Sequence, residues 1–198
     1  MHPLDTPTLH RAAAELAAQD ARLAAILDAH GPPPLWARTP GFPTLLHIIL
    51  EQQVSLASAR AAFDKLSAVA APLTPERFLE LDDATLKAAG FSRQKTRYGR
   101  ELAAALLSGS LDLDAVARLE DGPARAELMR IKGIGRWTAD IYLLMALLRP
   151  DVWPTGDLAL TVAAVEAPPC RRRMSWRRWP RDGSRGAPWP RGCSGTRT

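Results

Sequence analysis

The spacing of apolar residues restricts the possible folds of this chain more than any other feature. Between residues 8 and 30, apolar side chains recur every three or four positions, as on one face of a helix, until Gly31 and three prolines end the pattern. The same spacing predicts helices over residues 44–70, with a break near 53–55, and over 123–131 and 136–148. Ala and Leu dominate and β-branched runs are scarce. The sequence therefore predicts an all-α fold of one domain or two small lobes.

The charge of the chain is divided unevenly along its length. The formal charge is +5, but residues 167–198 contain nine arginines and a single acidic residue, Asp182. Residues 1–166 hold 17 basic and 20 acidic residues and so carry a formal charge of −3. The basic character of the whole chain is therefore no evidence that its folded part binds an acidic partner.

The composition changes after residue 166, which divides the chain into a helical region, 1–166, and a tail, 167–198. The tail holds five Pro, four Gly and three of the six Trp, and its apolar residues follow no helical or strand period. Such a segment cannot form a core, so we predict irregular, disordered structure. A natural basic tail is one interpretation. A shifted reading frame of a GC-rich gene is the other, and the composition favours it.

Membrane insertion and export have no support in the sequence. The longest apolar run covers residues 141–148, well short of the roughly 20 residues that cross a bilayer. The first ten residues lack the basic and apolar regions of a signal peptide. We therefore expect a cytoplasmic protein with no membrane partner.

The cysteine content bears on cofactors. Cys170 and Cys193 are the two cysteines of the chain, and an iron–sulfur cluster needs four thiolates. We therefore expect no iron–sulfur cluster and no other cofactor.

A Gly-Ile-Gly sequence at residues 133–135 separates the last two predicted helices. Glycine allows the tight turn, and amide groups at the start of the following helix lack helical acceptors, so they can bind an anion. Lys132 and Arg136 flank the turn, which makes DNA phosphate a natural anion for it. The other interpretation is an ordinary turn between helices with a glycine cap.

Several motifs in order resemble one family. The string LMRIKGIGRWTAD at residues 128–140 resembles the hairpin of the helix-hairpin-helix (HhH-GPD) superfamily of DNA glycosylases, and WPTGD at 153–157 resembles the loop that follows it. IILEQQVS at 48–55 and GFSRQKTR at 90–97 are similar to its alkylated-base branch, 3-methyladenine DNA glycosylase II. The resemblance covers residues 35–166. It implies a two-lobed helical fold in the short form, which lacks an N-terminal α/β domain, with the hairpin over 123–148.

The resemblance also implies how DNA is held. In this family the hairpin grips the DNA backbone, its carbonyl groups can hold a monovalent cation, and a side chain fills the gap left by the extruded base. The side chain at the matching position is Gln53, whose alternative role is that of a polar residue at a helix end. The implied hairpin contacts are Lys132, Gly133, Ile134, Gly135, Arg136 and Thr138.

Asp157 is the candidate catalytic residue, because it stands where the family has its catalytic carboxylate. Taken alone, it could be a helix N-cap, since an apolar helical stretch follows it at residues 158–164. A base alkylated on a ring nitrogen already carries positive charge and leaves readily, so one ionised carboxylate can suffice to stabilise the sugar cation and direct water. Asp140 is a weaker candidate, expected to form a surface pair with Arg136.

Trp137 distinguishes two possible reactions. Superfamily members that also cut the strand carry a lysine at this position, whose amine forms a Schiff base with the sugar, and tryptophan cannot do this. The resemblance implies a base pocket formed by Trp137, Ile141 and Leu158, in which the indole face attracts a cationic purine. Core packing is the other role open to Trp137.

These features predict a monofunctional base excision repair glycosylase. It would hydrolyse the N-glycosidic bond of alkylated purines in double-stranded DNA, leave an abasic site and act as a monomer. The alternative is a non-catalytic helix-hairpin-helix module that binds DNA, because the tail stands where the family has further helices that complete the pocket. A helical interaction protein without a DNA partner is the third possibility.

Overall fold

The computed structural model describes residues 3–166, and these residues form eleven α-helices without a strand. The helices are α1 Thr6–Gln19, α2 Ala21–His30, α3 Phe42–Glu51, α4 Leu56–Val69, α5 Pro75–Glu80, α6 Asp83–Ala88, α7 Arg93–Leu107, α8 Leu113–Arg118, α9 Asp121–Met129, α10 Arg136–Met145 and α11 Leu158–Glu166. The all-α prediction is confirmed. The predictions for the tail, residues 167–198, lie outside the described residues.

The helix ends follow local capping chemistry. Ser55, Thr74 and Ser92 each accept a hydrogen bond from a backbone amide in the first turn of α4, α5 and α7. The predicted helix over residues 8–30 is in fact two helices, because Asp20 leaves the helical conformation and caps the start of α2. The expected break within residues 44–70 is confirmed and lies between α3 and α4.

The hydrophobic core lies among the helices from α3 to α10. Helix α3 is its centre: Leu45, Leu46, Ile48 and Ile49 are fully buried, and α3 packs against α4, α7 and α10. A side chain at Gly99 would overlap Phe78, so α7 can approach α5 this closely only with glycine there. In contrast, α1 and α2 pack against each other and bury no residue completely.

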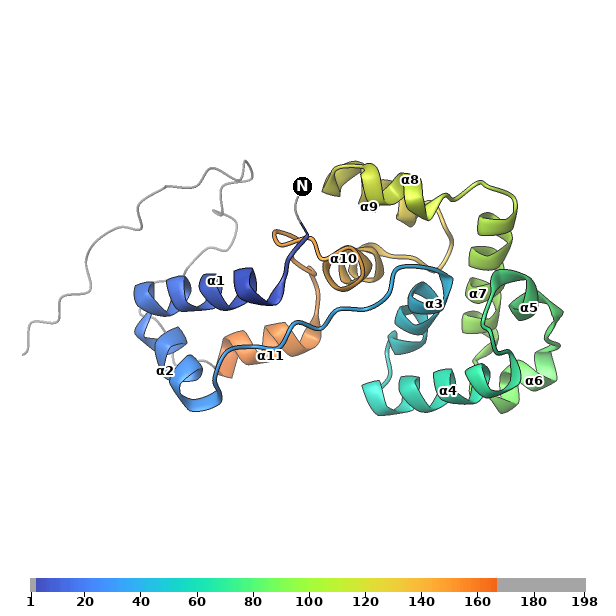
Figure 1. The fold of residues 1–198 in the computed structure, drawn as a ribbon. Helices are drawn as coiled ribbons and strands as arrows, with labels where there is room; N and C mark the ends of the chain where they lie inside the picture. Colours follow the sequence, from blue (N-terminus) through green and yellow to red (C-terminus); the bar gives the residue numbers. More distant parts are fainter. Residues whose placement is uncertain (1–2, 167–198) are drawn as a thin grey trace, which may run out of the picture.

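The arrangement gives the molecule two sides. Figure 1 shows α1, α2 and α11 on the left and α3 to α7 on the right, with α10 between them. Two backbone hydrogen bonds attach other segments to the C-terminal end of α10 and the residues that follow it. The Arg38 amide donates to the Met145 carbonyl oxygen, and the Leu4 amide donates to the Leu148 carbonyl oxygen. The segments between α9 and α10 and between α10 and α11 are therefore held next to one central helix.

No helix of residues 3–166 is long and apolar enough to cross a membrane.

Candidate functional site

The hairpin between α9 and α10 is built around two glycines with different tasks. Gly133 has a φ of 97°, and a Cβ at this position would overlap ring carbons of Tyr98 on α7. Ile134 is buried and anchors the turn in the core. Gly135 has an ordinary φ of −87° and is the N-cap of α10. A Cβ at Gly135 would meet nothing within 4 Å, so this glycine keeps the outer face of the turn open.

The outer face of the hairpin offers donors to an anion. The Gly135 cap provides no side-chain oxygen to the first turn of α10. Within the described part of the chain, the Gly133 and Gly135 amides donate to no protein acceptor. Lys132 and Arg136 are exposed on either side. The arrangement combines free amides, the positive end of a helix and two cationic side chains, and each of these features favours the binding of an anion.

The inner face of the hairpin is tied to α3 by Gln52, a residue that the sequence did not single out. Its Nε2 donates to the Gly133 carbonyl oxygen at 2.8 Å and to Thr138 Oγ1 at 2.9 Å. The Thr138 side chain is buried, so its hydroxyl faces Gln52 rather than the surface at which DNA was expected. The sequence carries no signal for this link, because 81 positions separate Gln52 from Gly133.

Gln53 lies at the surface in the loop that joins α3 to α4. Its φ of 58° falls in the left-handed region, which residues with a side chain seldom adopt. The neighbouring Val54 and Leu56 are 45% and 69% exposed, so the loop presents apolar as well as amide groups to the outside. Because Gln52 and Gln53 are adjacent, the exposed loop starts where α3 is fixed to the hairpin.

Asp157 follows α10 in the loop before α11, and both of its carboxylate oxygens accept hydrogen bonds. Trp137 Nε1 donates to Asp157 Oδ2 at 2.9 Å, and the Leu160 amide donates to Oδ1 at 3.0 Å. Asp157 therefore caps α11 and also contacts the indole of Trp137, so the capping role does not exclude the catalytic one. The structure brings Trp137 and Asp157 together from positions 20 residues apart.

Asp157 is held in its ionised form. Partial burial raises its pKa, but the hydrogen bonds from Trp137 and from the Leu160 and Ala159 amides outweigh this effect, and the pKa lies below the usual range. The carboxylate is half-buried, so it remains open to a ligand on one side. A fixed negative charge of this kind can stabilise a neighbouring cation.

The three residues of the predicted base pocket have different environments. Trp137 is half-buried at the start of α10, whereas Ile141, one turn later, is 5% exposed and belongs to the core. Leu158, at the start of α11, is 76% exposed. Trp137 thus combines partial core packing with a polar contact to Asp157, and Leu158 has most of its surface free.

Asp140 corrects one expectation from the sequence. It was expected to form a surface pair with Arg136, but it is completely buried on α10. The expected ion pair with Arg136 is present, with Nε 3.6 Å from Oδ2, and Arg125 of α9 also donates to Oδ1. Helical spacing identified Arg136 as a neighbour but gave no sign of Arg125. The buried carboxylate therefore joins the two helices that flank the hairpin.

A metal ion could be held either by acidic, histidine and cysteine side chains or by the backbone carbonyls of the hairpin. No group of three or more His, Cys, Asp or Glu side chains in residues 3–166 is arranged to hold a metal ion. At the hairpin, the carbonyl oxygen of Gly133 accepts from Gln52 and that of Ile131 accepts from the Ile134 amide. Each of these carbonyls keeps a second lone pair, so the monovalent cation expected at the hairpin carbonyls stays a prediction. Cys170 and Cys193 lie outside the described residues.

An all-α scaffold with a glycine hairpin between two helices and a fixed carboxylate in the next loop is the arrangement of the helix-hairpin-helix class of protein. The chain belongs to the HhH-GPD superfamily: a family model described as "HhH-GPD superfamily base excision DNA repair protein" matches residues 46–167, more than half of the sequence.

Individual relatives agree with this family. The chain is 32% identical over 120 residues to DNA-3-methyladenine glycosylase 1 of Schizosaccharomyces pombe, covering 59% of this chain and 53% of that protein. A DNA-3-methyladenine glycosidase structure from Bacillus halodurans has 30% identity and a TM-score of 0.67, over 84% of this chain and 77% of that one. The S. pombe 3-methyladenine DNA glycosylase Mag1, solved with abasic DNA, has 27% identity and a TM-score of 0.71, over 76% of each chain. The chain spans about half the length of the curated relatives that it matches.

Proposed function

We propose that this protein is a base excision repair glycosylase that hydrolyses the N-glycosidic bond of alkylated purines in double-stranded DNA. The observation that carries the proposal is the carboxylate of Asp157, which accepts a hydrogen bond from Trp137 Nε1 at 2.9 Å and has a lowered pKa, in the loop that follows the hairpin and α10. The names of the relatives, 3-methyladenine glycosylases from a yeast and from bacilli, support the same substrate class.

The proposed chemistry needs one well-placed negative charge. Gln53 and its loop enter the space left by the extruded nucleotide, while the hairpin from Lys132 to Arg136 holds the backbone. The alkylated purine is a cationic leaving group, and its departure leaves positive charge on the sugar. The Asp157 carboxylate stabilises this charge and orients the attacking water. The indole of Trp137 and the side chain of Leu158 contact the extruded base.

The reaction is expected to stop at the abasic site. Cutting the strand through a Schiff base needs an amine, and Trp137 stands where the strand-cutting members of the superfamily have a lysine. We propose that the enzyme works as a cytoplasmic monomer without a cofactor.

The test uses methylated duplex DNA and the full chain. We expect release of 3-methyladenine, together with a DNA strand that remains intact until hot alkali cleaves it at the abasic site. Strand cleavage without alkali would contradict the monofunctional mechanism. Absence of released base would contradict the glycosylase activity itself.

One observation favours a second candidate function, a non-catalytic module that binds DNA. Three apolar residues of α11 are exposed: Leu158, Leu160 and Val162. The carboxylate thus lies beside a helix whose apolar surface is open in the described chain. Under this alternative, the protein would bind abasic duplex in a salt-sensitive manner and release no base, and Asp157→Asn would leave both properties unchanged.

A further inference from the structure

The first two turns of α7 lie between the two segments proposed to contact DNA. Lys95 Nζ donates to the Leu50 carbonyl oxygen at 2.7 Å, which fixes α7 to the end of α3 just before the Gln53 loop. On the neighbouring side of the helix, the Tyr98 ring lies directly against Gly133 of the hairpin. Any exposed side chain beside Tyr98 is therefore close to the hairpin.

Arg97 is such a side chain. It is exposed, and its guanidinium carbon lies 5.8 Å from the centroid of the Tyr98 ring. Glu101 stands one turn further along the same helix, at the spacing of a helical ion pair, yet no ion pair joins it to Arg97 in the described residues. The Arg97 guanidinium thus lies over the Tyr98 ring, which packs against Gly133 of the hairpin. Its positive charge is free to bind an anion from outside the protein.

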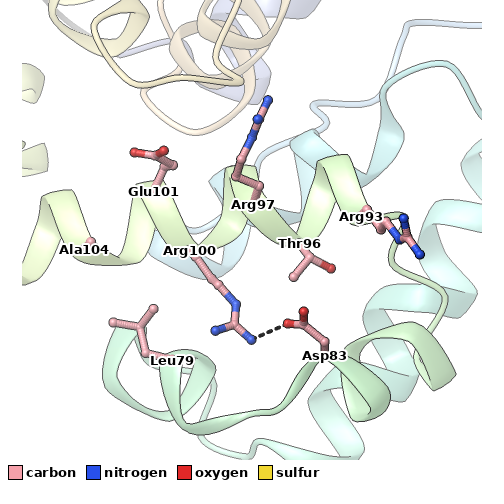
Figure 2. Close-up of a pocket in the computed structure, with 8 residues that line it drawn as sticks. All are labelled: Leu79, Asp83, Arg93, Thr96, Arg97, Arg100, Glu101 and Ala104. Atoms are coloured by element: carbon pink, nitrogen blue, oxygen red, sulfur yellow. Dashed lines mark hydrogen bonds and ion pairs between the residues drawn. The ribbon is translucent and has the colours of Figure 1, made fainter.

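Arg100, which lies one turn after Arg97 on α7, is engaged within the protein. Arg93, Thr96 and Arg100 are among the residues that line a groove of about 440 Å³ between α7 and the α5–α6 region. Figure 2 shows Arg100 directed across this groove to Asp83, whereas Arg97 extends from the opposite side of α7. Arg100 also donates to the Leu81 carbonyl oxygen, so its role is to hold α7 and the α5–α6 region together.

We propose that Arg97 is a further DNA-contacting residue, which binds a backbone phosphate next to the one held by the hairpin. This inference rests on the proposed function, because it requires DNA on the hairpin. The Tyr98 ring restricts the guanidinium before DNA arrives, so less side-chain freedom is lost on binding. Arg97 thereby extends the phosphate-binding surface from the hairpin onto α7.

The test measures DNA affinity against salt concentration, with a duplex that contains an abasic-site analogue. Each phosphate contact contributes about 0.9 to the slope of log K against log salt concentration. We expect Arg97→Gln to reduce the slope by about this amount and Arg97→Lys, which keeps the charge, to retain most of it. Arg11→Gln is the matched control, since it removes an exposed arginine on α1, on the opposite side of Figure 1.

The outcomes separate this inference from the proposed function. Salt-dependent binding by the unchanged protein together with an unaltered slope for Arg97→Gln would overturn the role of Arg97 alone. Equal slope losses for Arg97→Gln and Arg11→Gln would also overturn it, because they would indicate a general effect of net charge. Salt-insensitive binding by the unchanged protein would overturn DNA binding by the hairpin as well. Because Arg97 is exposed, thermal unfolding should show the same midpoint for all variants.

Discussion

At the scale of single residues, the indole of Trp137 is the one side chain that lowers the pKa of Asp157, together with two backbone amides of α11. Trp137 is a donor that cannot itself ionise, so its bond to Oδ2 favours the charged carboxylate at every pH. The bond stabilises the folded protein above the ordinary carboxyl pKa, and this contribution is lost as the pH falls through the lowered pKa of Asp157.

The variant Trp137→Phe tests this dependence. Phenylalanine keeps an aromatic ring but lacks the donor, so the pKa of Asp157 should rise, and the acid-side midpoint of kcat/KM should move to higher pH. A pH–rate profile of base release from methylated DNA measures the midpoint. If the rate fell at every pH with the midpoint unchanged, Trp137 would act through packing or base contact and not through the carboxylate.

The two hairpin glycines provide a second residue-scale test, because alanine should affect them differently. Gly133→Ala introduces a side chain at a φ of 97° and against Tyr98, which should cost roughly 1–3 kcal/mol of folding free energy. In Gly135→Ala the added Cβ meets no neighbour, and the backbone there has an ordinary φ. The free energy of unfolding should therefore change by less than about 0.5 kcal/mol.

The measurements for this pair are urea unfolding and affinity for abasic duplex. Gly135→Ala should weaken DNA binding even though it leaves the fold stable, because its methyl group would stand where we propose that the phosphate approaches the amides. Unchanged affinity for Gly135→Ala would show that the phosphate does not contact this face of the hairpin.

At the scale of elements, Gln52 joins the end of α3 to the hairpin and so fixes the Gln53 loop relative to the segment proposed to bind the DNA backbone. Gln52→Met removes the donor with little change in size, and we expect it to slow base release most when the lesion is paired, because extrusion then costs more. The measurement compares kcat for a lesion in normal duplex with kcat for the same lesion opposite an abasic site. Equal slowing on both substrates would contradict a role in extrusion.

The elements themselves could be predicted well from the sequence. Apolar spacing identified the break between α3 and α4, and the Gly-Ile-Gly sequence identified the turn before α10, because these signals are local. The break at Asp20 was missed, since the apolar pattern continues across it. Gln52 and the burial of Asp140 were also missed: each depends on a partner in another helix, and nothing in the neighbouring residues indicates that partner.

At the scale of the whole molecule, charge and apolar surface are distributed unevenly. Residues 1–166 carry a formal charge of −3, so attraction to DNA must come from local groups such as Lys132, Arg136 and Arg97. Helices α1 and α2 expose apolar side chains, in agreement with their lack of buried residues. Three of these side chains are 40–52% exposed: Leu16, Leu23 and Ile26. The candidate catalytic loop joins α10, which packs in the core, to α11, which presents apolar residues to the outside.

The most direct test of the central claim is base release from methylated duplex DNA by the full chain and by Asp157→Asn. Asparagine has nearly the same shape and can still cap α11 through its oxygen, but its amide nitrogen cannot accept from Trp137, so the variant removes the charge and one hydrogen bond. We predict that release falls on the order of 100-fold or more, while affinity for abasic duplex is retained. Release at the unchanged rate in Asp157→Asn, or no release by either protein, would contradict catalysis by this carboxylate.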